Sequence, residues 1–196
     1  MKKHVVLIVM MFGVSLVLSG CQTDELAHEL KTFTVSGLIA EFDPKKNFRK
    51  QSFQVSLATL KSTHECSRCY LKGAILSGAD LTKANLMGTS LLEADLSNAN
   101  LQGANLQDAI LVRANLRGAN LQRAKLYDAN LFEANLRHAN LNGADLVRSR
   151  PQDADLQGAN LSGANLRESN LQRANLRGAD LRGADLRGAD LRGAKL

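Results

Sequence analysis

The sequence contains no tryptophan, and aromatic residues make up only 4% of its 196 residues. Domains of this length ordinarily rely on aromatic side chains for much of their buried area, so this core must be built from smaller side chains. Beyond residue 70 there is no cysteine and only one histidine, His138. The sequence therefore predicts no catalytic, metal or cofactor site in that region.

A large excess of charge of one sign is also missing. The chain carries 25 Lys and Arg against 19 Asp and Glu, a formal net charge of +6. Without residues 1–20, which hold Lys2 and Lys3, the balance is 23 against 19, or +4. This mild basic charge is spread along the chain, unlike a nucleic-acid-binding arm or a polybasic membrane cluster. We therefore expect no nucleic-acid partner.

The one long apolar run, Val5 to Leu18, spans 14 residues. A membrane-spanning helix needs about 20, whereas a basic start followed by a run of this length is typical of a secretory signal. Leu18-Ser19-Gly20-Cys21 resembles the bacterial lipobox. The resemblance implies a lipoprotein signal peptide over residues 1–20, acyl chains such as palmitate on Cys21, and a membrane anchor. Gln22 follows the cysteine. In the Gram-negative lipoproteins that this signal resembles, a non-acidic residue there goes with outer-membrane sorting, so the resemblance favours the periplasmic face of the outer membrane.

From residue 71 onward, leucine recurs at every fifth position. The 26 positions from Leu71 to Leu196 hold 25 Leu and Pro151, and the residue two places earlier is Ala in 22 of the 26. On an α-helix a five-residue step rotates by about 500°, so the leucines would spiral around it. On a straight strand they would alternate between faces. A chain that turns one corner per repeat solves both problems, with Leu and Ala inward and Gly favoured at the corner.

Ala179-Asp180-Leu181-Arg182-Gly183 and Ala99-Asn100-Leu101-Gln102-Gly103 resemble the signature of the pentapeptide-repeat family. The resemblance implies an all-β solenoid over residues 71–196, a right-handed quadrilateral β-helix with about twenty residues per turn. At a strand spacing of about 4.8 Å this gives a rod roughly 30 Å long. An interior of Leu and Ala leaves no room for a ligand pocket, so we expect no small-molecule substrate and no cofactor.

The segment before the repeats falls into two predicted parts. Residues 21–47 are interpreted as a tether, and residues 48–70 as a capping segment with a short amphipathic helix that covers the apolar end of the solenoid. Cys66 and Cys69 lead into the first repeat, as cysteines do in many proteins of the resembled family. A metal site lacks ligands and a redox site lacks its fold context. In an oxidising periplasm the two cysteines can form a disulfide.

Twenty residues per turn sort the outward side chains into four columns. Apolar outward residues gather on two adjacent faces in the middle turns, and a contiguous apolar patch often marks an interface. Stacking that merely stabilises the sheet is an equally open interpretation. If the patch is an interface, its partner is another envelope protein or a second copy of the chain. Together, the two apolar columns predict an interaction surface formed by Met87, Leu92, Ile110, Val112, Tyr127 and Phe132.

Three further features concern the outer faces. A ladder of mostly alternating charges runs beside the apolar column, and we expect it to form weak, solvated pairs. Pro151 lacks the N–H that the ladder of backbone bonds requires, which predicts a local bulge. Arginines concentrate in the last turn, where a charged rim would discourage end-to-end pairing; binding of an anionic glycan or lipid head group is the alternative. The charge ladder comprises Glu93, Arg113, Glu133, Asp153 and Arg173.

Taken together, these features predict a non-catalytic, lipid-anchored scaffold or interaction module at the bacterial cell envelope. The alternative comes from the resembled family, in which some members protect DNA gyrase by mimicking the acidic rod of DNA. Residues 71–196 carry 16 Lys and Arg against 13 Asp and Glu, a net charge of +3. A DNA mimic should be strongly negative, and an export signal would separate the protein from gyrase.

Overall fold

The computed structural model describes residues 8–10, 13–15, 60 and 62–196. The chain divides into two units, Met1–Phe42 and Asp43–Leu196. In the first unit, β1 (Ile8–Met10) pairs antiparallel with β2 (Gly13–Ser15), with Val9 opposite Val14. Cys21, the tether 21–47 and most of the capping segment 48–70 lie outside the described residues. Within the described part of the chain, no helix is long and apolar enough to cross a bilayer.

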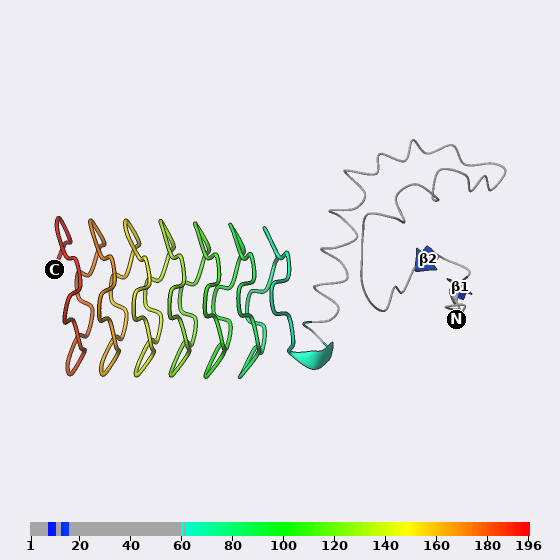
Figure 1. Ribbon diagram of the computed structural model, residues 1–196, viewed down its shortest axis with the longest axis horizontal. Helices are drawn as coiled ribbons and strands as arrows, with labels where there is room; N and C mark the ends of the chain where they lie inside the picture. The colour runs from blue at the N-terminus through cyan, green and yellow to red at the C-terminus, as the bar shows by residue number, and fades with distance from the viewer. Residues whose placement is uncertain (1–7, 11–12, 16–59, 61) are drawn as a thin grey trace, which may run out of the picture. The chain divides into compact units, whose positions relative to one another are not determined.

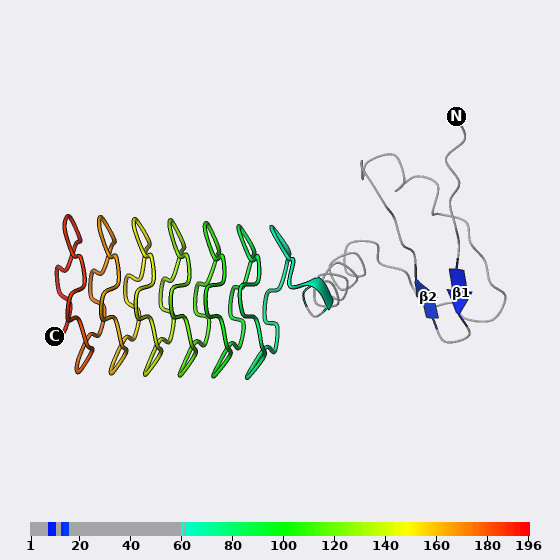
Figure 2. The ribbon, with the colours of Figure 1, turned by 90° about the horizontal axis from the view of Figure 1, so that it is seen from below.

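In the second unit, residues 65–196 form a coil whose turns stack along one axis (Figures 1 and 2). Its turns are joined by isolated parallel bridges, and each bridge pairs residues twenty apart, from Glu65 with Asn85 to Asn175 with Lys195. Because the backbone turns after every fifth residue, each twenty-residue turn has four sides. The predicted coil is confirmed as a four-sided stack of pentapeptides.

The coil begins one repeat earlier than the predicted start at Leu71. The first bridge involves Glu65, and Cys66 is 2% exposed, in the inward position that leucine holds elsewhere. The leucine period conceals this repeat because cysteine takes its place, and a buried cysteine packs as a small apolar side chain. Before it, residues 60 and 62–63 have helical backbone, and Leu60 is fully buried against the core.

Each repeat provides a hydrogen bond for nearly every backbone N–H, and this explains the signature. In the repeat around Leu96, the N–H groups of Asp95, Leu96 and Asn98 bond to carbonyls of neighbouring turns. The N–H of Ala99 bonds to the carbonyl of Leu96 across the corner. The remaining N–H, of Ser97, donates to the Asp95 carboxylate at 3.0 Å. Where Asn or Asp precedes the leucine, as in most repeats, its side chain thus bonds to the N–H that the coil leaves without a backbone partner.

The same asparagines also link successive turns through their side chains. Asn120 donates from Nδ2 to Oδ1 of Asn100 at 3.1 Å, and Asn140 and Asn160 continue the column at 3.3 Å each. These bonds form an amide ladder along this face. Stacked amides of this kind hold neighbouring strands in register.

Every corner has left-handed backbone, whether or not it holds glycine. The 26 corner positions from Arg68 to Gly193 all have positive φ, and 14 of them are not glycine, with φ between 55° and 58°. This conformation costs roughly 1–2 kcal/mol for a residue with a Cβ. None of the 14 is β-branched, the class of side chain that tolerates it least. Glycine therefore eases the corner, but the stacked turns impose it everywhere.

Pro151 interrupts one bridge without producing the predicted bulge. Among the described turns, the bridge expected between Arg150 and Asn170 is the only one missing from the series. On either side the twenty-residue register continues, because the N–H of Asp153 still bonds to the carbonyl of Gln172 at 2.9 Å. The prediction of a bulge is wrong because the neighbouring inter-turn bonds hold the spacing; only the N–H that proline lacks is lost.

Candidate functional site

The predicted interaction surface lies on two adjoining sides of the coil. The N–H of Glu93 bonds to the carbonyl of Val112, and the N–H of Arg113 to that of Phe132, both at 2.9 Å. These bonds place Leu92, Val112 and Phe132 directly above one another. We call these three residues, together with Ile110, the apolar stripe.

The stripe is less exposed than isolated outward side chains would be. Leu92, Val112 and Phe132 are each half-buried, since each covers part of the next, while Ile110 is 43% exposed. Met87 and Tyr127, on the adjoining side, are also half-buried. Stacking therefore accounts for part of the column, and Ile110 is the member that stacking does not cover.

Ile110 stands where most repeats have asparagine or aspartate. In the next turn Asn130 holds this position, and its Oδ1 accepts the backbone N–H of Phe132 at 3.2 Å. Isoleucine has no oxygen for the equivalent N–H of Val112. The exchange gives up a local hydrogen bond and places an aliphatic side chain in water, so neither the backbone nor the core accounts for it.

Tyr127 is covered by a neighbouring turn. The guanidinium of Arg148 lies 4.7 Å from the centre of the Tyr127 ring and also donates two hydrogen bonds to Asp128, at 3.0 and 2.6 Å. A cation held over an aromatic face in this way adds a modest stabilisation. Tyr127 therefore belongs to a packed cluster with Arg148 and Asp128 and contributes little free ring surface.

One residue missing from the sequence-based surface is Tyr70. It is 40% exposed and precedes Leu71 on the same side as Ile110, two turns earlier. The sequence-based sorting begins with the predicted repeats at Leu71, so it does not include Tyr70, which stands just before them. Ile75, at the same position of the next side, is 81% exposed.

The charge ladder beside the stripe forms discrete pairs. Arg113 bonds to Glu133 and Arg173 to Asp153, each with its closest approach at 2.6 Å, and Lys72 lies 3.7 Å from Glu93. The hydrogen bonds from Arg173 lower the pKa of Asp153 from its usual value. The side chains are substantially exposed, so these pairs add little stability.

The last turns carry three pairs within single repeats. Arg182, Arg187 and Arg192 each bond through two guanidinium nitrogens to the aspartate two residues earlier. Hydrogen bonds from Arg182 and Arg187 lower the pKa of Asp180 and Asp185 to about 2. These arginines are already paired, which leaves less charge for an anionic ligand than their number implies.

At the other end of the coil, the structure joins Cys66 and Cys69 in a disulfide, with 5.3 Å between their Cα atoms. Thr89 donates its hydroxyl to the carbonyl of Cys66 from the next turn. In the described residues no group of three or more His, Cys, Asp or Glu side chains is placed to hold a metal ion.

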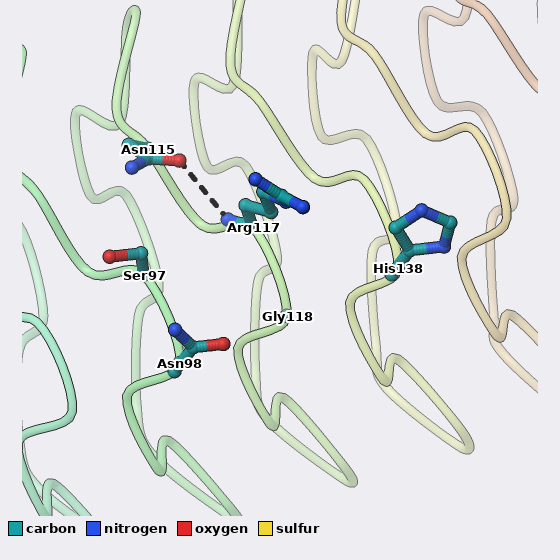
Figure 3. Close-up of a pocket in the computed structure, with 6 residues that line it drawn as sticks. All are labelled: Ser97, Asn98, Asn115, Arg117, Gly118 and His138. Atoms are coloured by element: carbon teal, nitrogen blue, oxygen red, sulfur yellow. Dashed lines mark hydrogen bonds between the residues drawn. The ribbon is translucent and has the colours of Figure 1, made fainter.

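A hollow of about 460 Å³ opens on a different side of the coil (Figure 3). Arg117 stands over it, and Figure 3 shows the carboxamide of Asn98 directed toward Gly118. The backbone N–H of Arg117 bonds to Oδ1 of Asn115 at 3.3 Å. The hollow is lined by Ser97, Asn98, Asn115, Arg117, Gly118 and His138.

The repeat geometry agrees with the comparison to known families. The family described as Pentapeptide repeats matches residues 65–103, 99–137, 129–167 and 159–196, eight copies in all. The matched segments cover residues 65–196, so the chain belongs to the pentapeptide-repeat family. The family forms right-handed quadrilateral β-helices, in agreement with the predicted fold class. No curated protein matches the chain.

Several solved structures resemble the chain. HetL from Nostoc sp. strain PCC 7120, a pentapeptide-repeat protein involved in heterocyst differentiation regulation, is 36% identical over 66% of this chain and 71% of its own, with a TM-score of 0.35. Rfr23, a pentapeptide-repeat protein from Cyanothece 51142, is 25% identical over 74% of this chain and 99% of its own, with a TM-score of 0.40. QnrB1, a plasmid-mediated fluoroquinolone resistance protein, is 24% identical over 61% and 71%, with a TM-score of 0.44.

Proposed function

We propose that this pentapeptide-repeat protein is a non-catalytic interaction module, held at the bacterial cell envelope by a lipid on Cys21, that binds a protein partner through the apolar stripe. The anchor is inferred from Leu18-Ser19-Gly20-Cys21 at the end of the apolar run. Several acyl chains on one residue would give firm attachment, since each buried methylene contributes roughly 0.8 kcal/mol.

The choice of an outer surface follows from the packing of the interior. Leucine and alanine side chains from Leu71 to Leu176 form one continuous core, nearly all of it inaccessible to solvent. A filled interior offers no enclosed cavity for a substrate. Binding therefore has to use the sides or the ends of the coil.

Ile110 is the observation that carries the choice of the stripe. It replaces the residue that would bond to the N–H of Val112, and 43% of it is exposed beside Val112. A partner would cover this aliphatic surface together with Phe132, the largest side chain of the stripe, and aromatic residues are enriched in the centres of interfaces. Tyr70 extends the same side by two turns.

Changing Val112 and Phe132 together to Ser should reduce cross-linking to the partner in intact cells. Both side chains point away from the core, so the circular dichroism of the coil should persist, with a loss of about 0.2–1 kcal/mol for each stacked pair. The matched control changes Gln152 and Gln172 to Ser. These two residues lie in the same column as Val112 and Phe132, and their substitution removes no apolar side chain. Unchanged cross-linking in the V112S/F132S variant would mean that the stripe only stabilises the coil.

Replacing Cys21 with Ser should abolish labelling by a radioactive fatty acid and move the protein from the membrane to the soluble fraction. Wild-type protein and the stripe variant, fractionated in parallel, serve as controls because both keep Cys21. A Cys21→Ser variant that stays labelled and membrane-bound would refute the anchor without affecting the stripe. A cytoplasmic wild-type protein would instead favour the gyrase-protecting alternative, which the net charge of +3 over residues 71–196 opposes.

A further inference from the structure

The hollow beside Arg117 lies where the corner column on this side alternates between glycine and larger residues, from Gly78 to Gly158. It reads Gly78, Asn98, Gly118, His138, Gly158 and Gly178. A Cβ on Gly118 would lie 2.5 Å from Oδ1 of Asn98, and a Cβ on Gly158 would lie 2.6 Å from Nδ1 of His138. Each larger side chain therefore leans over the glycine that follows it. Gly118 thus lies between the turns of Asn98 and His138, with Oδ1 of Asn98 beside it, while His138 leans away toward Gly158.

Arg117 brings an uncompensated charge to this hollow. One turn later, Arg137 bonds through a guanidinium nitrogen to Asp155 at 3.1 Å, eighteen residues further on. The equivalent position for Arg117 holds Asn135, which carries no charge. Within residues 62–196, Arg117 has no carboxylate within 4.0 Å.

The other carboxylate on this side of the coil is already engaged. Asp95, in the preceding turn, accepts hydrogen bonds from the backbone N–H of Ser97 at 3.0 Å and from Nδ2 of Asn115 at 2.9 Å. Arg117 lines the same hollow as Gly118, and Figure 3 shows its side chain directed toward the turn that carries His138. The carboxamide of Asn98 can turn to present its Nδ2 donors to the same space.

We propose that the hollow over Gly118 binds an oxyanion, a carboxylate or phosphate group, with Arg117 as its principal ligand. A guanidinium presents two parallel N–H donors that match two oxygens of such a group. The carboxamide of Asn98 faces Gly118 with Oδ1, and a half-turn about its last bond would replace this acceptor with the Nδ2 donors. This site is separate from the apolar stripe and does not depend on it, so either can fail without the other.

Inorganic phosphate and acetate are the probes that test the site. Each is titrated at constant ionic strength, balanced with sodium chloride, into the full chain in an uncharged detergent. The readouts are the NMR signals of the Gly118 backbone N–H and the Arg117 Nε–H. Saturable shifts at both groups are expected, and the tighter of the two probes identifies the preferred chemistry. Signals that move only linearly with either probe would overturn the proposal.

Arg117→Gln should weaken binding about two- to fivefold, the range for a solvent-exposed charge pair. Arg177→Gln is the matched control. Arg177 lies on the same side of the coil and, like Arg117, precedes a glycine. Eighteen residues further on it has Lys195 and no carboxylate, and it does not line the hollow. Equal weakening by the two variants would show that only the overall charge matters and would overturn the site.

Gly118→Asn tests the hollow without changing any charge. Asn98 already occupies the same corner one turn earlier with φ of 56°, so the coil can accommodate asparagine at this position. The added side chain would meet the flexible end of Asn98 and fill the floor of the hollow. Binding should fall at least as far as in Arg117→Gln, with unchanged circular dichroism. Full binding in a folded Gly118→Asn variant would refute the assignment.

Discussion

Ser149 offers a direct way to stabilise the coil. It occupies the small inward position that alanine holds in 22 of 26 repeats. Its side chain is fully buried, and its Oγ has no hydrogen-bond partner. Burying a hydroxyl without a partner costs about 1–3 kcal/mol. Replacing Ser149 with Ala removes this cost, so the free energy of unfolding should rise by about 1–3 kcal/mol. The melting temperature should rise by about 2–4 °C for each kcal/mol.

Ser169 provides the matched control, one turn later in the same column. It is equally buried, but its Oγ donates to the carbonyl of Leu166 at 2.7 Å. Ser169→Ala removes a satisfied hydrogen bond, so it should leave stability unchanged or lower it by about 0.5–1.5 kcal/mol. Thermal unfolding of both variants, followed by circular dichroism, gives the comparison. The reasoning fails if Ser149→Ala is no more stable than the wild type, or if the two variants shift equally.

Two further predictions concern single turns. Backbone amides in residues 148–152 should exchange with deuterium faster than those at 128–132, because proline gives no bond to the carbonyl of Asn170; equal protection in a mass-spectrometric exchange experiment would contradict this. Lowering the pH should also loosen the last turns. The folded pKa of Asp180 and Asp185 is about 2 against an ordinary 3.8, so the stabilising contribution of their pairs with Arg182 and Arg187 is present above pH 3.8 and is lost as the pH falls toward 2. The N–H groups of Leu181, Gly183 and Leu186 make no backbone hydrogen bond to another turn, so residues 180–187 should exchange faster than 100–107 at either pH. The expected result is that the ratio of the two protection factors is larger at pH 2 than at pH 5.

The leucine period predicts the coil well because the residues that recur with this period are the same residues that form the core. Each leucine meets leucines of the turns above and below, and any shift of register would expose it. The start of the coil was harder to find, since Cys66 fills a leucine position with a different residue. The predicted bulge at Pro151 is wrong because the sequence shows the local effect of proline but not the inter-turn bonds around it. A local rule about proline in strands is overridden when the turns on both sides are already bonded in register.

The corners show a second limit of the sequence. Glycine at a corner signals positive φ, but arginine, glutamate and aspartate at the equivalent positions give no such signal, and the structure places them in the same conformation. Inter-turn bonds impose it on all of them at once. The strain at any one corner is therefore a consequence of stacking and cannot be read from the residue that occupies it.

The leucine period predicts where the apolar stripe lies, whereas its role depends on the residues that stand directly before leucine. Asparagine and aspartate there serve the backbone, as the bond from the N–H of Phe132 to Asn130 shows. Polar residues at this position therefore carry little information about binding. A residue without a short-chain oxygen gives up that bond, and its presence calls for another cause. Ile110 is such a residue in the middle of the coil, next to Val112, and Tyr70 repeats the exchange on the same side. Ile75 makes the same exchange on the next side, so such an exception indicates a partner's side only where it lies beside an apolar column, as Ile110 does beside Val112.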